Sequence, residues 1–85
     1  MAENLTQEVK EMLAKLTGLD ATDIGDNDDL INDLGIDSLK VIEIATQVER
    51  TYKVTVKDSD LMKLRKVNDA VAYLKELLEK KGAQQ

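Results

Sequence analysis

Apolar residues recur at helical spacing in three stretches of the chain, and each stretch predicts an amphipathic helix. The first predicted helix covers about residues 5–16. Asn4, followed by Gln7 three residues later, resembles a capping box, and Gly18 suits the position just past the helix end. The apolar face of this helix comprises Leu5, Val9, Met12, Leu13 and Leu16.

The second predicted helix covers about residues 38–51, and Asp37 is a favourable N-cap for it. Its core-facing stripe comprises Val41, Ile44, Ala45, Val48 and Tyr52. The last helix is predicted over about residues 67–80, with Gly82 beyond its end. The stripe of that helix comprises Val67, Ala70, Val71, Leu74, Leu77 and Leu78.

The segments between these helices show no sustained helical period. Apolar residues punctuate a run of aspartates over residues 19–36, which predicts a long loop pinned onto the core, with a short turn near residues 28–32. Residues 53–56 alternate like a strand, but no other segment offers a partner strand, so we interpret them as an extended connector. Residues 58–60 can cap a short helix that continues through Leu64.

These elements predict an all-α fold: a small bundle of three main helices plus one short helix, with a long loop between helices one and two. We expect a single domain over residues 1–85, with a core spanning about residues 5–80.

The composition is typical of a soluble globular protein, with 42% hydrophobic and 34% charged residues. The core must be aliphatic, because Phe and Trp are absent. Cys and His are absent too, which excludes disulfides, Cys/His zinc sites, thiolate nucleophiles and Ser-His-Asp catalysis. The amino terminus has no basic region followed by a long apolar run. We therefore expect a cytoplasmic protein without a signal peptide, transit peptide or membrane span.

The net charge of −5 is distributed unevenly. Residues 1–49 hold 12 acids and 3 bases, a net charge of −9, whereas residues 50–85 hold 5 acids and 9 bases, a net charge of +4. The acidic half disfavours nucleic acid as a partner and favours a basic protein surface.

The aspartates of the loop do not fit the EF-hand pattern, which needs an oxygen ligand at its fifth position. Counted from Asp26 the fifth residue is Leu30, and counted from Asp20 it is Ile24. We interpret the loop as a solvated acidic segment and assign no metal site.

Leu39 and Ile42 lie off the core-facing stripe of the second helix, on a side that they share with Glu43, Thr46 and Glu49. Single exposed apolar residues are normal on protein surfaces. A docking patch with an apolar centre and an acidic rim fits the spacing equally well. The neighbouring Ser38 favours the docking patch.

Ser38, in the first turn of the same helix, has three interpretations. It can simply help to cap the helix, which the sequence physics alone favours. It is a poor catalytic nucleophile, because the chain has no His to act as a base and lacks the nucleophile-elbow pattern. It is well placed as a covalent attachment point, because helix N-terminal amides and the helix dipole stabilise a phosphodiester anion.

The motif Asp37-Ser38-Leu39 after Leu34-Gly35, within this complete helical layout, resembles the acyl carrier protein family over residues 5–80. The similarity continues along the second helix through Glu43, the core-facing residues, Glu49 and Tyr52. The resemblance implies that a separate phosphopantetheinyl transferase, using coenzyme A and magnesium, converts Ser38 to a 4′-phosphopantetheine ester. The thiol of that group would hold an acyl chain as a thioester, which supplies the sulfur that the chain lacks.

The resemblance also implies a monomeric carrier that is not an enzyme and that presents acyl intermediates to fatty-acid, lipid or polyketide biosynthetic enzymes. The surface read by the transferase, acyl-loading and synthase enzymes would comprise Asp37, Leu39, Ile42, Glu43, Thr46 and Glu49. The interior between the second, third and fourth helices would hold the acyl chain. Two alternatives stay open: an unmodified carrier-fold interaction module, and an aminoacyl or peptidyl carrier.

Several residues depart from the pattern of fatty-acid carriers. Thr46 replaces an apolar residue on the recognition face, and Lys57 replaces the proline before the short helix. Lys66 replaces a threonine cap before the last helix, which predicts a cost of about 1 kcal/mol. Bases also stand at positions that are commonly acidic or neutral, namely Lys40, Arg50, Lys63 and Arg65. These changes favour a specialised carrier of a polyketide or dedicated lipid pathway.

Overall fold

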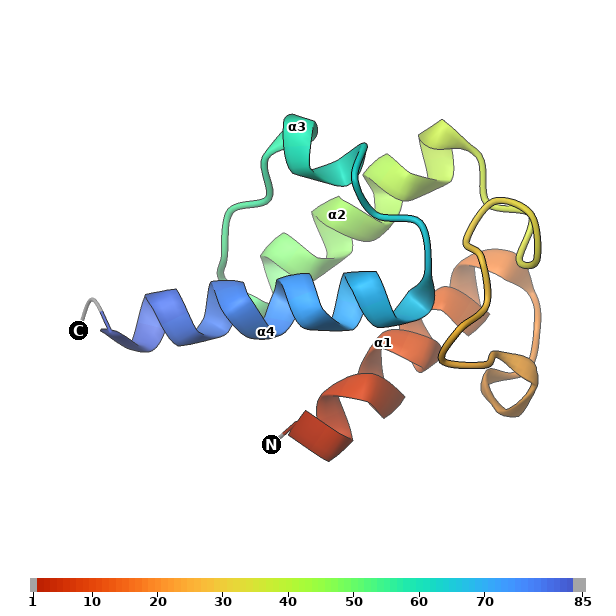
Figure 1. Ribbon diagram of the computed structural model, residues 1–85, viewed down its shortest axis with the longest axis horizontal. Helices are drawn as coiled ribbons and strands as arrows, with labels where there is room; N and C mark the ends of the chain where they lie inside the picture. Colours follow the sequence, from red (N-terminus) through yellow and green to blue (C-terminus); the bar gives the residue numbers. More distant parts are fainter. Residues whose placement is uncertain (1, 84–85) are drawn as a thin grey trace.

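The computed structural model describes residues 2–83 and folds them as a helical bundle (Figure 1). In chain order the elements are α1 (Ala2–Thr17), the 3₁₀ turn η1 (Ala21–Asp23), α2 (Ser38–Tyr52), α3 (Asp58–Leu61) and α4 (Val67–Ala83). The described residues contain no strand. The predicted all-α fold, with three long helices and one short one, is confirmed.

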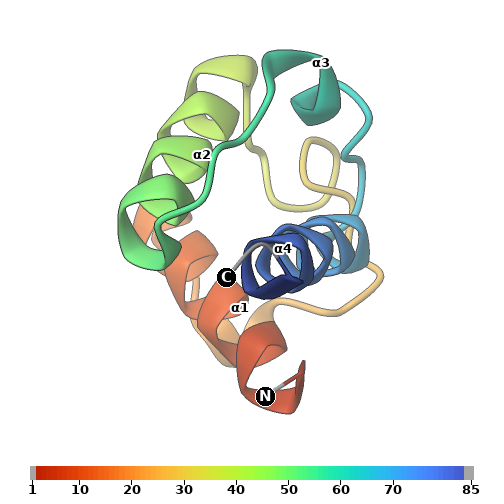
Figure 2. The same ribbon diagram turned by 90° about the vertical axis from the view of Figure 1, so that its left-hand side faces the viewer.

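The helix α1 packs against both α4 and α2, and α3 packs on α2. Two views at right angles place α3 and the N-terminal half of α2 together at one end of the molecule (Figures 1 and 2). Among the described residues, no helix has the length and apolar character that a membrane crossing requires. The predicted extended connector over residues 53–56 differs from the structure at its first residue, because Lys53 ends α2 in the left-handed conformation (φ 58°). Residues 54–57 follow it without helix or strand.

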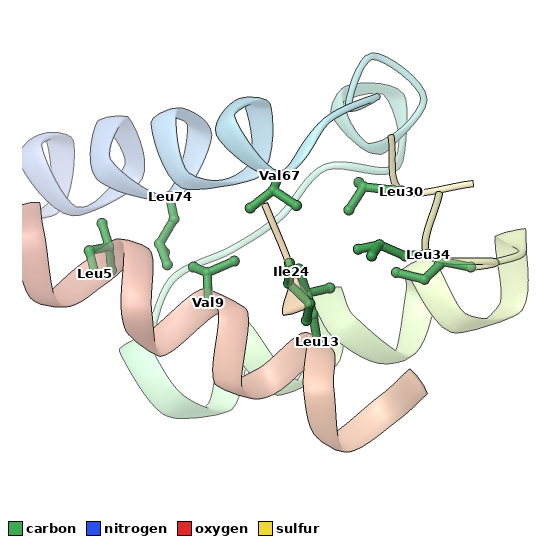
Figure 3. Close-up of a cluster of buried hydrophobic side chains, with 9 residues drawn as sticks. Leu5, Val9, Leu13, Ile24, Leu30, Leu34, Val67 and Leu74 are labelled. Atoms are coloured by element: carbon green, nitrogen blue, oxygen red, sulfur yellow. The ribbon is translucent and has the colours of Figure 1, made fainter. Parts of the chain in front are cut away.

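The core lies where α1 meets α4 and the long loop. Figure 3 shows Leu5, Val9 and Leu13 on α1 facing Val67 and Leu74 on α4. Among the described residues the loop contributes more buried anchors than α1 does, and these are Ile24, Leu30, Leu34 and Ile36. The prediction of a loop pinned onto the core is therefore confirmed, and burial of these side chains supplies the free energy that orders it.

The aspartates of the loop cap its backbone. One Asp28 carboxylate oxygen accepts from the Gly25 N–H at 2.8 Å. The Asp29 carboxylate accepts from the N–H groups two and three residues ahead, at 2.9 and 2.8 Å, and Asp33 accepts from the Asp29 N–H at 2.7 Å. These carboxylates accept hydrogen bonds from backbone N–H groups of the loop, and in this way they stabilise its turns. No group of three or more metal-ligating side chains is present in the described part of the chain.

Two backbone hydrogen bonds join this loop to the segment before α4. The Leu30 N–H donates to the Arg65 carbonyl at 2.7 Å, and the Val67 N–H donates to the Asp28 carbonyl at 3.0 Å. Together they form an isolated antiparallel bridge. This contact fixes the loop against the C-terminal half of the chain.

The backbone N–H groups at the start of α4 donate to acceptors in the long loop and on Asp69, and no threonine cap is needed. The Asn68 N–H donates to the Asp26 carbonyl at 2.9 Å, and the Asp69 carboxylate accepts from the Lys66 N–H at 3.0 Å. The loop carbonyls serve the amides that a capping side chain would serve. Lys66 therefore precedes the helix without leaving these amides unpaired.

The predicted N-terminal boundary of the first helix is wrong. The helix α1 begins at Ala2, so Asn4 lies inside it rather than at its N-cap. The Gln7 side chain donates instead to Glu11 at 3.4 Å. Alanine and glutamate before Asn4 are good helix formers, which lets the helix start earlier than the cap signal suggested.

The boundaries near the two C-terminal helices also differ from the prediction. The helix α3 ends at Leu61, and the chain continues to Leu64 in turns rather than in helix. The helix α4 runs to Ala83, so Gly82 lies inside its last turn. The long loop also forms η1, which the sequence pattern did not predict. The turn that was predicted near residues 28–32 extends from Asp29 to Gly35.

We predict that Asp29→Ala lowers the urea midpoint at neutral pH more than Asp23→Ala does. The hydrogen bond from the Asn32 N–H is the largest cause that holds the pKa of Asp29 below 3.8. A lowered folded-state pKa means that the stabilisation is complete above 3.8 and is lost as the pH falls through the folded value. The gap between wild type and Asp29→Ala should therefore shrink in acid.

Urea unfolding of both variants across the acid range tests this prediction. Asp23 is a matched control, because its exposed carboxylate accepts no hydrogen bond within the described residues. Equal effects of the two substitutions, or a gap that does not change with pH, would show that Asp29 does not cap the turn.

Candidate functional site

Ser38 is the first residue of α2, and its side chain is exposed. Asp37 is the N-cap, as predicted: its carboxylate accepts from the Lys40 N–H at 2.9 Å. Just before this cap, Gly35 adopts a left-handed conformation (φ 69°), which glycine adopts without strain. Ile36 is fully buried. The turn and the buried anchor direct the chain so that Ser38 emerges at the surface.

The N-terminal amides at Ser38 are suited to an anion. Within the described residues, the backbone N–H groups of Ser38 and Leu39 donate no hydrogen bond. They lie at the positive end of the fifteen-residue helix α2. A phosphodiester on the Ser38 oxygen would therefore meet free donors and a favourable dipole, so these residues fit a covalent phosphate group.

A cavity of about 650 Å³ opens beside Ser38. Its walls come from α2, from α3 and the segment after it, and from the long loop, and its lining is Leu30, Ile31, Ser38, Val41, Ile42, Asp58, Leu61, Met62 and Leu64. Apart from Ser38 and Asp58, every lining side chain is apolar. The volume and the lining are typical of a site for a small apolar ligand.

The position of this cavity differs from the predicted acyl-chain interior between the second, third and fourth helices, which stays a prediction. No residue of α4 lines it, and the long loop takes that place through Leu30 and Ile31. Nothing in the sequence pattern predicted a function for these two residues, nor for the wall residues Leu61, Met62 and Leu64. The sequence marks these residues only as apolar positions within short polar segments. That pattern does not reveal which segments pack against one another.

Most of the predicted recognition residues lie on one exposed surface. Leu39 and Ile42 are 65% and 54% exposed, which confirms that they lie off the core-facing stripe. Asp37, Glu43 and Thr46 are also exposed. The Thr46 hydroxyl donates to the Ile42 carbonyl at 3.0 Å, so it is satisfied within α2.

Glu49 differs from the other predicted recognition residues. It is only partly exposed, and one of its carboxylate oxygens accepts from the Val56 N–H at 2.8 Å. The connector after α2 folds back over this side chain. Glu49 therefore has a structural role that the helical spacing alone did not indicate, and its part in recognition stays a prediction.

The comparisons with known proteins agree with this geometry. The sequence matches the family model described as "Phosphopantetheine attachment site" over residues 7–74, which is most of the chain. The protein belongs to this family of acyl carrier proteins. As a member, it bears 4′-phosphopantetheine covalently and carries acyl groups as thioesters. The comparisons do not favour an unmodified interaction module.

Similar proteins include the acyl carrier protein of Rhodococcus erythropolis, which is 39% identical over 96% of this chain and 89% of its own length. The meromycolate extension acyl carrier protein of Mycobacterium bovis is also 39% identical, over 91% of this chain and 67% of its own length. The crystal structure of an acyl carrier protein from Thermotoga maritima superposes with a TM-score of 0.80. That structure is 24% identical in sequence, and the superposition covers 93% of this chain and 92% of the Thermotoga chain. It shows the same fold.

We predict that Ile42→Ala changes the carrier's stability much less than Ile44→Ala does. Ile44 packs against the core, whereas Ile42 is more than half exposed. Truncating a core isoleucine costs about 2–4 kcal/mol, whereas the Ile42 truncation should cost less than about 1 kcal/mol. Urea unfolding of the two variants compares the same substitution on two faces of one helix. A core-sized loss for Ile42→Ala would show that this face is structural rather than free for partners.

Proposed function

We propose that Ser38 is the residue that bears the 4′-phosphopantetheine ester. The observation that supports this most strongly is its exposed position at the start of α2, with unused backbone donors and the apolar cavity beside it. The chain has one other serine, Ser59, which also follows an aspartate. Ser59 lies in the four-residue helix α3, which is too short to offer a comparable dipole.

Modification of Ser38 requires an outside catalyst. Its oxygen forms a new bond to phosphorus while the phosphoanhydride bond of coenzyme A breaks and adenosine 3′,5′-bisphosphate leaves, and a base must take the hydroxyl proton. The chain has no His or Cys, so we assign that base to the transferase. In this proposal the protein is a substrate and carrier, and it catalyses no step alone.

The attached group supplies a thiol for thioester chemistry. The residues around Ser38 position the base of this arm: the free amides of Ser38 and Leu39 hold its phosphate, and Asp37 fixes the end of the helix by its own cap. We propose that the neighbouring cavity shelters the acyl chain from water. Its wall residues Val41, Leu61 and Leu64 supply the aliphatic contacts.

The partners that we propose are the phosphopantetheinyl transferase, an acyl-loading enzyme and synthase enzymes. They would read Leu39 and Ile42 as an apolar centre with Asp37 and Glu43 at its acidic edge. We propose that the carrier meets these enzymes in the cytoplasm. We also propose that it is a monomer, because the transferase needs access to Ser38 and the other enzymes need access to the thiol of the arm. The bases after α3 favour a specialised lipid or polyketide pathway over a housekeeping one.

We predict that Ser38→Ala abolishes the covalent modification, whereas Ser59→Ala does not. Each protein is co-expressed with a broad-specificity phosphopantetheinyl transferase, and its intact mass is measured. The wild type and Ser59→Ala should gain the mass of one phosphopantetheine group. A mass gain that persists in Ser38→Ala, or no gain in the wild type, would refute the assignment to Ser38.

We predict that octanoylation raises the thermal midpoint of the modified carrier, because the chain replaces water against the apolar walls of the cavity. Leu61→Asn should reduce this rise, since it places an amide in the cavity wall. Leu19→Asn is the matched control, because Leu19 is an exposed loop leucine outside the cavity. Differential scanning calorimetry of holo and octanoyl forms measures the rise. No rise in the wild type would place the acyl chain outside the cavity.

A further inference from the structure

Residues 62–66, here called the basic segment, combine an exposed apolar side chain with three cations. Met62 is 88% exposed. The side chains of Lys63, Arg65 and Lys66 are exposed as well, and the segment contains no acid. Within the described residues, none of these three cations forms an ion pair. Leu64, between them, points into the cavity wall.

The acids closest in sequence to the basic segment are engaged elsewhere. The Asp69 carboxylate accepts from the backbone N–H groups of Arg65 and Lys66 at 3.1 and 3.0 Å. The Asp60 carboxylate accepts from the Tyr73 hydroxyl at 2.7 Å. Their hydrogen bonds hold the backbone and the tyrosine rather than the cationic side chains. Arg65 lies near Asp29, and its charge helps to lower the pKa of that carboxyl, but the two side chains form no ion pair in the described part of the chain. Among the described residues the three cations thus keep hydrogen-bonding capacity for a partner.

The basic segment adjoins the opening beside Ser38. Met62 lines the same cavity as Ser38 and Ile42. Figures 1 and 2 show the chain after α3 descending to α4 on the side of the molecule opposite α2. The opening therefore has an apolar rim, with Ile42 of α2 and Met62 of the basic segment among its lining. Glu43, the neighbour of Ile42 in sequence, is an exposed acid of α2. An enzyme that reaches the Ser38 hydroxyl covers this rim.

We propose that the basic segment docks against an acidic patch on the phosphopantetheinyl transferase, while Glu43 on α2 meets a basic patch on the same enzyme. This inference rests on the proposed attachment at Ser38. Complementary charges speed the encounter and fix its orientation, whereas a uniformly basic enzyme surface would be repelled by Lys63, Arg65 and Lys66. The two opposite charges also define which way round the enzyme lies on the opening.

Two other occupants fit the same opening less well. An anionic lipid surface would attract the basic segment but repel Asp37 and Glu43, the exposed acids next to Ser38 and Ile42 in sequence. A second copy of the chain could pair the acids of α2 with the bases of the segment. That dimer would cover Ser38, which the carrier must keep accessible.

The test is the transferase kinetics of charge-reversal variants of the full chain. The host's own phosphopantetheinyl transferase is assayed with coenzyme A and wild-type carrier, Lys63→Glu/Arg65→Glu, and Glu43→Lys. We expect each variant to lose about fivefold or more in kcat/KM at low salt, mostly through KM. The loss should shrink at about 0.5 M salt, where exposed charges are screened.

The matched control is Lys75→Glu/Lys80→Glu, which makes the same change in net charge on exposed positions of α4. It should stay close to the wild type. Circular dichroism confirms that every variant is folded. An equal loss of kcat/KM in the control would show that the loss follows from the change in net charge alone, which would overturn the proposal. A rise in kcat/KM for Lys63→Glu/Arg65→Glu would show that the enzyme presents cations there, which also overturns it.

Two further measurements decide between occupants. Flotation with vesicles of phosphatidylglycerol and phosphatidylcholine, and sedimentation equilibrium of the wild type, should show neither lipid binding nor a dimer. Binding or dimerisation that Lys63→Glu/Arg65→Glu abolishes would assign the basic segment to that occupant instead. If the wild type is modified normally while the reversal has no effect, this inference fails and the proposed function stands. If the wild type is not modified at all, both fail.

Discussion

Two hydrogen bonds between the long loop and the segment before α4 are the contact on which the rest of the site depends. Leu30 and Val67 donate them, and both side chains are buried in the core. Burial of these apolar groups supplies most of the stabilisation, and the directional bonds set the register in which the loop meets the helix. The same contact places Leu30 and Ile31 on one wall of the cavity and Leu64 on another. It also gives the first amides of α4 their acceptors.

The loop acids and the α2 acids illustrate two uses of the same residue types. Asp28, Asp29 and Asp33 accept backbone hydrogen bonds within the loop, so their charges stabilise turns. Glu43 is exposed on α2 beside the apolar pair and is free to meet a partner. The composition shows only that the first half of the chain is acidic. The structure distinguishes the aspartates that accept hydrogen bonds within the loop from Glu43, which is exposed on α2.

The local features of the site could be predicted from sequence because their signals lie within a few residues. The cap at Asp37 and the exposure of Leu39 and Ile42 follow from an N-cap residue and a clean helical period. The long-range contacts could not be predicted, because nothing in the pattern states that residues 28–30 meet residues 65–67. The cavity depends on that meeting, so its loop wall was missed. The hydrogen bond from the Val56 N–H to Glu49 could not be predicted for the same reason, because the connector that folds over Glu49 has no local signal.

The family explains how a chain without Cys or His takes part in acyl chemistry: the reactive thiol belongs to the attached group, and the protein supplies its placement. The most direct test of this account is fragmentation mass spectrometry of the carrier purified from its native host. The account predicts that a phosphopantetheine arm bearing an acyl thioester maps to Ser38. An arm on Ser59 or on any other residue, or a carrier population with no arm, would contradict it.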